Sequence, residues 1–514
     1  MTLAPPILPG GVEGAPLVCT AADPSTSLRG NGGQTDVIIL GSGFSGLGMA
    51  IALQQEGKRS YVVLEKGAGV GGTWRENRYP GCACDVPSHL YSFSFAQNAG
   101  WTRHFAPQKE ILGYLERTAD QFGVRAHCRF GVEAQTCTYD EATSSWQVTT
   151  RTGDVFRAPQ LVLGVGALHH PKFPEVPGRE KFKGPQLHSA AWDESVSLEG
   201  KRIAVVGTGA SAIQLVPALA PHVKQLTLFQ RTPAWVVPRA DAPISRLARW
   251  LYRVAPWLMK LTRAAIYWKL ESRALGFTRW PRVLLAAEWL GKRHIRKQVK
   301  DAALRERLTP KYAAGCKRIL LSDDYYPAFN RPNVALESSA VKEVTETGVV
   351  TPDGRHVECD AIAWCTGFEV AAPLSRLKVL GRAGKDLGAT WSEGLHAYRG
   401  TTVPGFPNMY VLMGPNTGLG HNSMVYMIES QIRFAMAHLK ALDAAGAKSV
   451  EVTEEAEREF NAGLQARLPG TVWASGCNSW YLDVHGRNAM LWPGATFSFR
   501  KLTSEVELGH VKLK

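Results

Sequence analysis

Two short glycine-rich segments are the residues of this chain whose types and spacing most directly indicate chemistry. The first, from Gly41 to Gly46, has the pattern G-x-G-x-x-G and follows the apolar run 36–40. Such a loop lets the backbone approach a pyrophosphate, which then lies at the positive N-terminus of the next helix. An acid about 20 residues further on, at the end of the next strand, accepts hydrogen bonds from a ribose hydroxyl. The sequence therefore predicts a dinucleotide site instead of a chance glycine turn, formed by Gly41, Gly43, Phe44, Ser45, Gly46, Glu65 and Lys66.

The second glycine-rich segment, G-T-G-A-S-A at 207–212, follows the apolar run 201–206. After its helix and the next apolar run, 225–229, the chain carries Arg231, where the first unit carries an acid. An acid at this place suits an unphosphorylated ribose, whereas an arginine accommodates a 2′-phosphate. This exchange predicts NADPH over NADH, although an exposed arginine beside a helix is the alternative. The predicted binding residues are Gly207, Thr208, Gly209, Ser211, Arg231 and Thr232.

The stretch between these two units has the pattern F-x-G-x-x-x-H-x-x-x-W-D, formed by Phe182, Gly184, His188, Trp192 and Asp193. Placed between two nucleotide-binding signatures, it resembles the fingerprint of the type I flavin-dependent Baeyer-Villiger monooxygenases. The resemblance implies FAD and NADPH as cofactors. It also implies that this linker couples nicotinamide binding to flavin chemistry. Taken singly, His188 would be read as a turn histidine and Trp192 as a core residue.

Residues 71–85 match a second motif of that family. The motif consists of G-G-x-W, four residues, Y-P-G, three residues and a final D. The resemblance places Gly72, Thr73, Trp74 and Tyr91 beside the flavin. It makes Asp85 the acid that orients a catalytic arginine, which corresponds to Arg318. A guanidinium is permanently charged and carries several donors, so it can stabilise negative charge on oxygen without acting as an acid. Lys317, beside Arg318, matches a residue that contacts the NADP phosphate region.

Two later segments complete the resemblance. The run 359–368 is similar to a cofactor-flanking strand of flavin monooxygenases, from which we assign Thr366 and Gly367. The loop 411–423 leads into a helix over about 424–442, and its backbone amides are expected to face the reduced flavin. Met413 and Asn416 are assigned to the cofactor from that loop, and no residue is assigned to a metal.

These units imply an α/β fold with two Rossmann-like dinucleotide-binding domains, for FAD and NADPH, and a helical insertion. We expect a flexible arm over residues 1–33. The FAD domain is expected over 34–180 and 357–514, with a small antiparallel excursion that includes strand 146–150. The NADPH domain is expected over 181–240 and 311–356, and the insertion over 241–310.

The insertion carries most of the chain's net charge of +14, with sixteen Lys and Arg against five Asp and Glu between residues 241 and 310. Aromatic and basic residues alternate at helical spacing over 244–300. The segment resembles in position the helices that lie over the substrate cavity in this family. We expect such a cap, and weak contact with a membrane surface is the alternative. We expect no nucleic-acid partner, because no recognised binding module accompanies the charge.

The composition is that of a globular protein of two to four domains, with 45 % hydrophobic residues in 514. The first residues contain no basic stretch followed by an apolar one, so we expect no secretory signal. The nine cysteines show no disulfide-framework spacing. These features predict unpaired thiols and a cytoplasmic location, while the oligomeric state stays open.

The resemblance implies an NADPH- and O2-dependent oxidation of ketones to esters or lactones through a C4a-peroxyflavin. A related N- or S-oxygenating flavin monooxygenase is the alternative within the same class. The Trp192-Asp193 ending and the pair Asp85 and Arg318 argue against it. A flavin-linked disulfide reductase would use Cys82 and Cys84, but their C-x-C spacing is not the usual C-x-x-C. A non-catalytic protein that retains the fold is the remaining alternative.

Overall fold

Two five-stranded parallel sheets organise the chain in this computed structural model, which describes residues 32–369, 376–477, 479, 481–483 and 485–514. The first sheet has the strand order β20 (Met409–Val411), β8 (Gln160–Leu163), β2 (Val37–Leu40), β3 (Tyr61–Glu65) and β4 (Cys128–Phe130). Strands β2, β3 and β8 are buried at every position, as expected for continuous apolar runs covered on both faces. The predicted strand, loop, helix, strand order of the first unit is therefore confirmed.

The second sheet has the order β14 (Val334–Glu337), β11 (Gln225–Phe229), β10 (Arg202–Val206), β18 (Ala361–Trp364) and β9 (Gln186–His188). Strand β18 pairs in parallel with β10 and with β9. It therefore belongs to the second unit, although we expected the first unit to resume at residue 357. Buried parallel strands of either sheet are equally apolar, so composition does not reveal which sheet such a strand joins.

A third sheet forms the predicted antiparallel excursion of the first unit. Strands β5 (Ala134–Asp140), β6 (Ser145–Thr150) and β7 (Val155–Ala158) pair antiparallel in sequence order. Strands β1 (Gly32–Gln34) and β19 (Lys378–Leu380) close its two edges in parallel. The predicted flexible arm 1–33 is wrong for its last two residues, because Gly32 and Gly33 pair with β7. Residues 1–31 lie outside the described residues.

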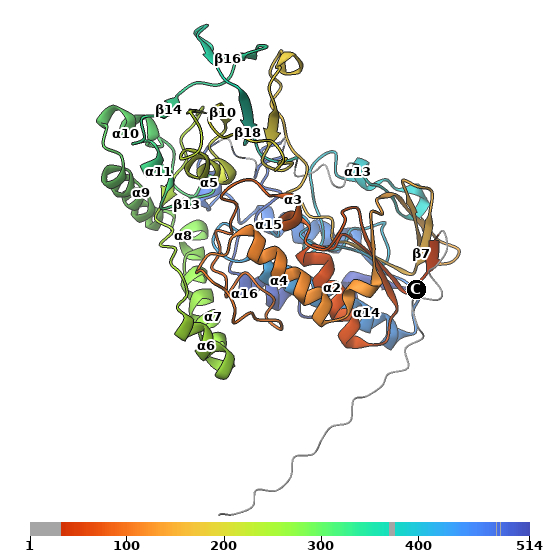
Figure 1. Ribbon diagram of the computed structural model, residues 1–514. Coiled ribbons are helices and arrows are strands. Elements are labelled where there is room, and N and C mark those ends of the chain that lie inside the picture. The colour runs from red at the N-terminus through yellow and green to blue at the C-terminus, as the bar shows by residue number, and fades with distance from the viewer. Residues whose placement is uncertain (1–31, 370–375, 478, 480, 484) are drawn as a thin grey trace, which may run out of the picture.

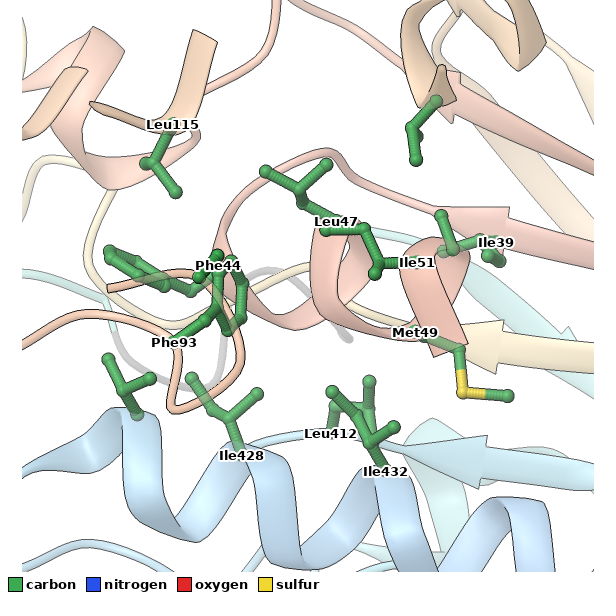
Figure 2. Close-up of a cluster of buried hydrophobic side chains, with 14 of the residues drawn as sticks. Ile39, Phe44, Leu47, Met49, Ile51, Phe93, Leu115, Leu412, Ile428 and Ile432 are labelled. Carbon is green, nitrogen blue, oxygen red and sulfur yellow. The ribbon is translucent and has the colours of Figure 1, made fainter. Parts of the chain in front are cut away.

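Helix α2 (Phe44–Glu56) lies between the first sheet and the long helix α14 (Met424–Ala445), and Figure 2 shows the side chains that meet there. Nine of the thirteen residues of α2 are buried, which suits a helix packed on several sides. A Cβ at Gly48 would lie 2.7 Å from the Ile432 side chain and 3.0 Å from the Phe93 ring. The two helices can therefore approach this closely because position 48 has no side chain. Helix α4 (Gln108–Gln121) covers the same cluster through Ile111, Tyr114 and Leu115.

The predicted insertion is helical, and Figure 1 shows it as a green arm along one side of the molecule. Its helices are α6 (Arg246–Val254), α7 (Pro256–Glu271), α8 (Ala274–Thr278), α9 (Leu285–Gln298) and α10 (Ala302–Leu308). The Ser245 hydroxyl caps α6 by accepting from Ala248 N, and Pro256 begins α7. The two helices pack against each other at the free end of the arm.

The remaining elements connect these layers. They include α3 (Thr73–Glu76), α5 (Ala210–Leu219), α11 (Tyr325–Ala328), α13 (Leu387–Thr390), α15 (Glu454–Gln465) and α16 (Thr496–Leu502). Short strand groups are β12 (Val236–Val237) with β13 (Leu320–Leu321), β15 (Glu343–Val344) with β16 (Gly348–Val350) and β17 (His356–Glu358), and β21 (Val450–Val452) with β22 (Val511–Leu513). Across the described ranges, every helix is too short or too polar to cross a membrane.

Candidate active site

The first glycine loop forms a cradle that side chains would fill. Gly41 has φ +92°, and a Cβ on it would lie 2.7 Å from Gly164 O. A Cβ on Gly46 would lie 1.8 Å from Gly41 O, which no rotamer relieves. Gly43 begins α2 and faces Gly72, whose φ is +50° and whose Cβ would lie 2.9 Å from the Gly43 Cα. This bare backbone at a helix N-terminus fits the pyrophosphate of a dinucleotide.

Glu65 is fixed by the loop that it serves. Its Oε2 accepts from Ser42 N at 2.7 Å and from Ser42 Oγ at 2.8 Å, and its Oε1 accepts from Gly67 N at 2.7 Å. The residue is 6 % exposed at the carboxyl end of β3. A carboxylate held in this way retains acceptor positions for a ribose hydroxyl. Lys66 follows it and is exposed.

Phe44 and Ser45 are both buried in the first turn of α2. The Phe44 ring lies 5.2 Å from the rings of Tyr91 and Phe93, so its side chain belongs to the core. Its contribution to a cofactor is therefore limited to its backbone amide.

The motif 71–85 and the residues that follow it up to Tyr91 lie beside the first glycine loop. Trp74 lies in α3, directly after Thr73, and its Nε1 donates to the Tyr91 hydroxyl at 3.2 Å. Both rings pack in the core around α2, and burial raises the pKa of the Tyr91 hydroxyl. Gly71 N donates to Ser42 O at 3.1 Å, which ties this loop to the first glycine loop. The structure therefore brings Gly72, Thr73 and Trp74 beside the predicted dinucleotide cradle.

The second glycine loop repeats the first with one substitution. Gly207 has φ +113°, and a Cβ on it would lie 2.3 Å from Cys365 O. Gly209 begins α5 with open space around it, whereas Ala212, in the third glycine's place, is fully buried. The Thr208 hydroxyl donates to Thr232 O at 2.8 Å and so joins the loop to the end of β11. Ser211 lies close enough to the Tyr79 hydroxyl of the first unit to influence the pKa of that hydroxyl, which burial raises.

Arg231 and Lys317 form a pair of neighbouring cations beside this loop. Burial, followed by the positive charge of Arg231, lowers the pKa of the Lys317 ammonium. Neither side chain has an acidic partner within the described part of the chain, and the Lys317 Nζ lies 5.1 Å from the centre of the Tyr312 ring. Two cations without an acid fit an anionic group such as a 2′-phosphate.

Asp85 and Arg318 join the two units. Arg318 precedes β13 and lies 233 residues from Asp85 in the chain, yet its Nε and Nη2 donate to Asp85 Oδ2 at 3.0 Å and 2.7 Å. The carboxylate charge raises the pKa of the Arg318 guanidinium above its usual range. Arg318 therefore stays charged and does not act as a proton donor.

The linker fingerprint forms the edge of the second sheet, where His188 stands opposite Trp364. A Cβ on Gly184 would lie 2.3 Å from Asp360 O, so this edge requires glycine. His188 Nδ1 accepts from Ala190 N at 3.0 Å, and burial lowers the pKa of its imidazole to about 4. The linker histidine is therefore neutral near pH 7.

The other fingerprint residues have structural contacts. Phe182 packs with Trp364, and Trp192 packs in the core around α5. Asp193 Oδ1 accepts from Ser195 N at 2.9 Å and from Ser195 Oγ at 2.6 Å, which makes a local turn. These three side chains therefore shape the linker itself.

The later predicted residues divide into two groups. The Thr366 hydroxyl donates to Lys172 O at 2.6 Å and lies 3.5 Å from His188 Nε2, and Gly367 has φ +92°. Thr366 therefore lies beside the linker histidine, and Gly367 O accepts from Lys172 N at 3.1 Å. Asn416 Nδ2 donates to Asn488 O at 2.7 Å and to Leu491 O at 3.1 Å, and its assignment to the cofactor stays a prediction. Its amide holds the C-terminal segment, and the backbone N of Met413 donates to Gln431 Oε1 at 2.8 Å.

Comparisons with known proteins agree with this geometry. The family model described as flavin-binding monooxygenase-like matches residues 34–381. A Baeyer-Villiger monooxygenase of Pseudomonas aeruginosa is 48 % identical over 92 % of this chain and 90 % of its own length. A Baeyer-Villiger monooxygenase of Streptomyces coelicolor is 47 % identical over 93 % of this chain and 92 % of its own length.

The chain belongs to the Baeyer-Villiger monooxygenase family. A solved steroid monooxygenase bound to NADP has a TM-score of 0.84 and 32 % identity, and covers 93 % of this chain and 99 % of its own. The enzyme is accordingly an FAD- and NADPH-dependent monooxygenase that converts ketones into esters or lactones. The predictions of family, fold class, cofactors and activity are confirmed.

Gln214 is a residue that sequence reasoning missed. It projects from α5 into the first unit, where its Oε1 accepts from the Tyr79 hydroxyl at 2.8 Å and its Nε2 donates to Ala83 O at 3.0 Å. A Cβ on Gly81 would lie 2.5 Å from Gln214 O. The Y-P-G part of the motif is thus the surface on which α5 docks.

Arg239 was missed as well, and its Nη2 donates to Cys84 O at 3.1 Å, beside Asp85. No spacing in the sequence signals either Gln214 or Arg239.

The cysteines differ in part from our expectation. Cys316, two residues before Arg318, forms a disulfide with Cys477, so the prediction of unpaired thiols is wrong for these two. Cys82 and Cys84 are free, and burial raises the pKa of both thiols, that of Cys82 to about 12. A thiol that stays protonated is a poor nucleophile, which argues against the disulfide-reductase alternative.

Proposed function

We propose that Arg318 is the catalytic group of this enzyme, that Asp85 positions it, and that the substrate is an apolar ketone. The observation that carries this proposal is the geometry of the ion pair. Both contacts of Arg318 go to a single oxygen, Asp85 Oδ2, through Nε and Nη2. Nη1 has no protein partner within the described ranges, and the Arg318 side chain is 36 % exposed. One edge of the guanidinium is thus held, and the other is available to a ligand.

Bound FAD, reduced by NADPH, would activate O2, of which one atom enters beside the carbonyl carbon and the other leaves as water. The protein has to stabilise negative charge on oxygen while that atom is transferred. A guanidinium held by a carboxylate does this without reorganising, and removal of one such donor typically costs about 100- to 1,000-fold in rate. Asp85 contributes by fixing the direction of the free edge of Arg318.

The surroundings of Arg318 favour an apolar substrate. The segment that carries it contributes Ala314 and Ile319 to an apolar cluster, in which Phe277 of the insertion and Trp473 take part. Tyr481 of the same cluster interacts electrostatically with Arg318. The inner side of the insertion therefore borders the Arg318 region, which supports its proposed role as a cap over the substrate.

The test is a panel of linear, cyclic, aryl and steroid ketones, assayed for NADPH consumption and for ester or lactone. Steroid and cyclic ketones are included because solved relatives are a steroid monooxygenase and cyclohexanone monooxygenases. We expect Arg318→Ala to consume NADPH and release hydrogen peroxide while ester falls by about 100-fold or more. Arg151→Ala, which removes an exposed ion pair with Glu133, is the matched control. Normal ester yield from Arg318→Ala would exclude the proposed role.

Asp85 requires a second readout, because a positioning residue acts through its partner. Asp85→Asn loses the charge, whereas Asp85→Glu retains a carboxylate on a longer stem. We expect kcat for ester to fall in both and to recover partly in Asp85→Glu, with KM for NADPH little changed. A change confined to KM for NADPH would place Asp85 in cofactor binding instead.

We propose in addition that the enzyme acts in the cytoplasm, where NADPH is regenerated. The six described free cysteines support this location, and the pair Cys316 and Cys477 argues against it because disulfides are rare there. Fractionation of cells that express the enzyme, followed by assay of ester formation, tests the proposal, and activity in the periplasmic fraction would overturn it.

A further inference from the structure

Two neighbouring helices of the insertion, α6 and α7, each carry an exposed apolar stripe. On α6 the stripe is Leu247, Trp250 and Val254, and on α7 it is Trp257, Leu261 and Trp268. Their spacings of three, four and seven residues place each set on one side of its helix. All six side chains are between 54 % and 65 % exposed. We call these six residues the tryptophan face.

The tryptophan face belongs to an unusual concentration of exposed apolar groups. Of the fifteen large apolar side chains exposed in the described part of the chain, eleven lie between Leu247 and Trp289. Isolated exposed apolar residues are ordinary on a protein surface, whereas a contiguous group marks an interaction site. This concentration is the mark of an interaction surface on the outer side of the insertion.

The charge around the tryptophan face has one sign. Residues 242–287 contain nine Lys and Arg and a single acid, Glu271. That acid is 3 % exposed and accepts hydrogen bonds from Asn422 Nδ2 and from the Thr496 hydroxyl. One of the nine cations, Arg263, is buried as well. The exposed charge of this segment, from Arg246 to Arg282, is thus entirely positive.

Buried polar contacts fix the orientation of α7. Arg263 Nη1 donates to the carbonyl oxygens of His89, Leu90 and Ser92 at 2.8, 3.2 and 3.0 Å. Glu271, two turns further on, is held by the loop before α14 and by the start of α16. A rotation that turned the tryptophans inward would leave both buried charges without partners. The half of the tryptophan face that lies on α7 is therefore a fixed outer surface.

We propose that the tryptophan face binds the surface of an anionic lipid bilayer. Interfacial helices bury apolar side chains about 5–10 Å into the headgroup region while Lys and Arg contact anionic lipids. Tryptophan suits this depth because its ring is apolar and its indole N–H is a donor. A second copy of this chain is a poor partner, since two faces with only positive charge repel each other. The helices lie on the bilayer, and none of those described is able to cross it.

The experiment is co-sedimentation of the FAD-loaded enzyme with vesicles of phosphatidylcholine, with and without phosphatidylserine, at low and high salt. We expect binding to the phosphatidylserine vesicles alone, weakened by salt because exposed charges are screened. For W250S/W257S we expect the affinity for phosphatidylserine vesicles to fall by about tenfold or more. R253E/K260E is expected to lose about twentyfold or more, since each surface cation contributes about fivefold. All variants are expected to keep ester formation from a water-soluble ketone.

The matched control is R151E/L508S, which changes an exposed cation and an exposed apolar residue away from the insertion. It is expected to bind phosphatidylserine vesicles as the unchanged enzyme does. The proposal is overturned if the enzyme ignores both vesicle types, if it binds them equally, or if the variants bind as well as the control. A dimer in light scattering that W250S/W257S abolishes, together with absent vesicle binding, would assign the face to self-association.

Discussion

Arg231→Ala provides a direct test of the proposed 2′-phosphate site. Arg231 is exposed at the end of β11, and its charge helps to lower the pKa of the neighbouring Lys317. A charge-assisted hydrogen bond contributes about 1.5–3 kcal/mol, and the exposed position of Arg231 favours the lower half of that range. We therefore expect kcat/KM for NADPH to fall by about 10- to 30-fold, at 1.4 kcal/mol for each factor of ten.

NADH is the internal control for this variant, because it has the same dinucleotide without the 2′-phosphate. We expect kcat/KM for NADH to change by less than about twofold, so the NADPH-to-NADH ratio falls by nearly the whole factor. The repulsion that lowers the Lys317 pKa disappears with Arg231, which leaves Lys317 as a slightly stronger partner of the phosphate. The loss of kcat/KM for NADPH in Arg231→Ala will therefore be smaller than it would be if Arg231 and Lys317 bound the phosphate independently.

The assay is steady-state NADPH and NADH oxidation with a saturating ketone, on flavin-loaded protein. Arg151→Ala, which removes an exposed arginine from β6's connection to β7, should leave the ratio unchanged. If Arg231→Ala slows both cofactors equally, the arginine supports the fold or the common part of the dinucleotide. If the ratio stays that of the unchanged enzyme, the two cations do not form the phosphate site.

Three further predictions concern stability and cofactor retention. Burial lowers the pKa of His438 to about 4 in the folded protein, compared with about 6.5 in the unfolded chain. Between pH 6.5 and pH 4 the unfolded chain therefore binds more protons than the folded protein. The free energy of unfolding should therefore decrease as the pH falls through this range. In urea titrations at pH 7 and pH 4, His438→Met should remove about 3 kcal/mol of that decrease. An equal decrease in the variant and in the unchanged enzyme would contradict this. Gly46→Ala places a Cβ 1.8 Å from Gly41 O and should abolish FAD retention, measured as flavin per purified protein, whereas Gly463→Ala, with open space around it, should not. Cys316→Ser opens a loop of 161 residues, which by loop closure costs up to about 5 kcal/mol. A reductant should therefore lower the melting temperature of the unchanged enzyme and not of this variant, and no effect on either would argue against the disulfide.

The local parts of the site could be predicted from sequence because they are encoded by neighbouring residues. A glycine loop, the strand before it and the acid after it lie within about 30 residues and specify one another. The same is true of the insertion, whose helical spacing and charge are visible in the sequence. These segments fold as expected, with boundaries shifted by a residue or two.

The contacts between distant segments could not be predicted from residue patterns. Arg318 meets Asp85 across 233 residues, and only the family resemblance paired them. Cys316 and Cys477 gave no signal, because their 161-residue separation matches no framework spacing. Gln214 reads as an ordinary helix residue, and Asn416 as a loop residue free for a ligand. In each case the partner is chosen by the packing of the two units, which sequence spacing does not record.

The placement of the two units decides whether the ion pair exists at all. The loop 79–85 belongs to the first unit, yet the second unit holds it at one end through Gln214 and at the other through Arg318. Lys317 is the residue next to Arg318, and adjacent Cα atoms are about 3.8 Å apart. A phosphate on the proposed site of Lys317 and Arg231 would therefore contact the same short segment that carries the Arg318 guanidinium. Cys316, two residues before Arg318, ties the same segment to Cys477 in the C-terminal region. On the roles proposed for these residues, NADPH binding and the position of Arg318 are linked through the segment 316–318.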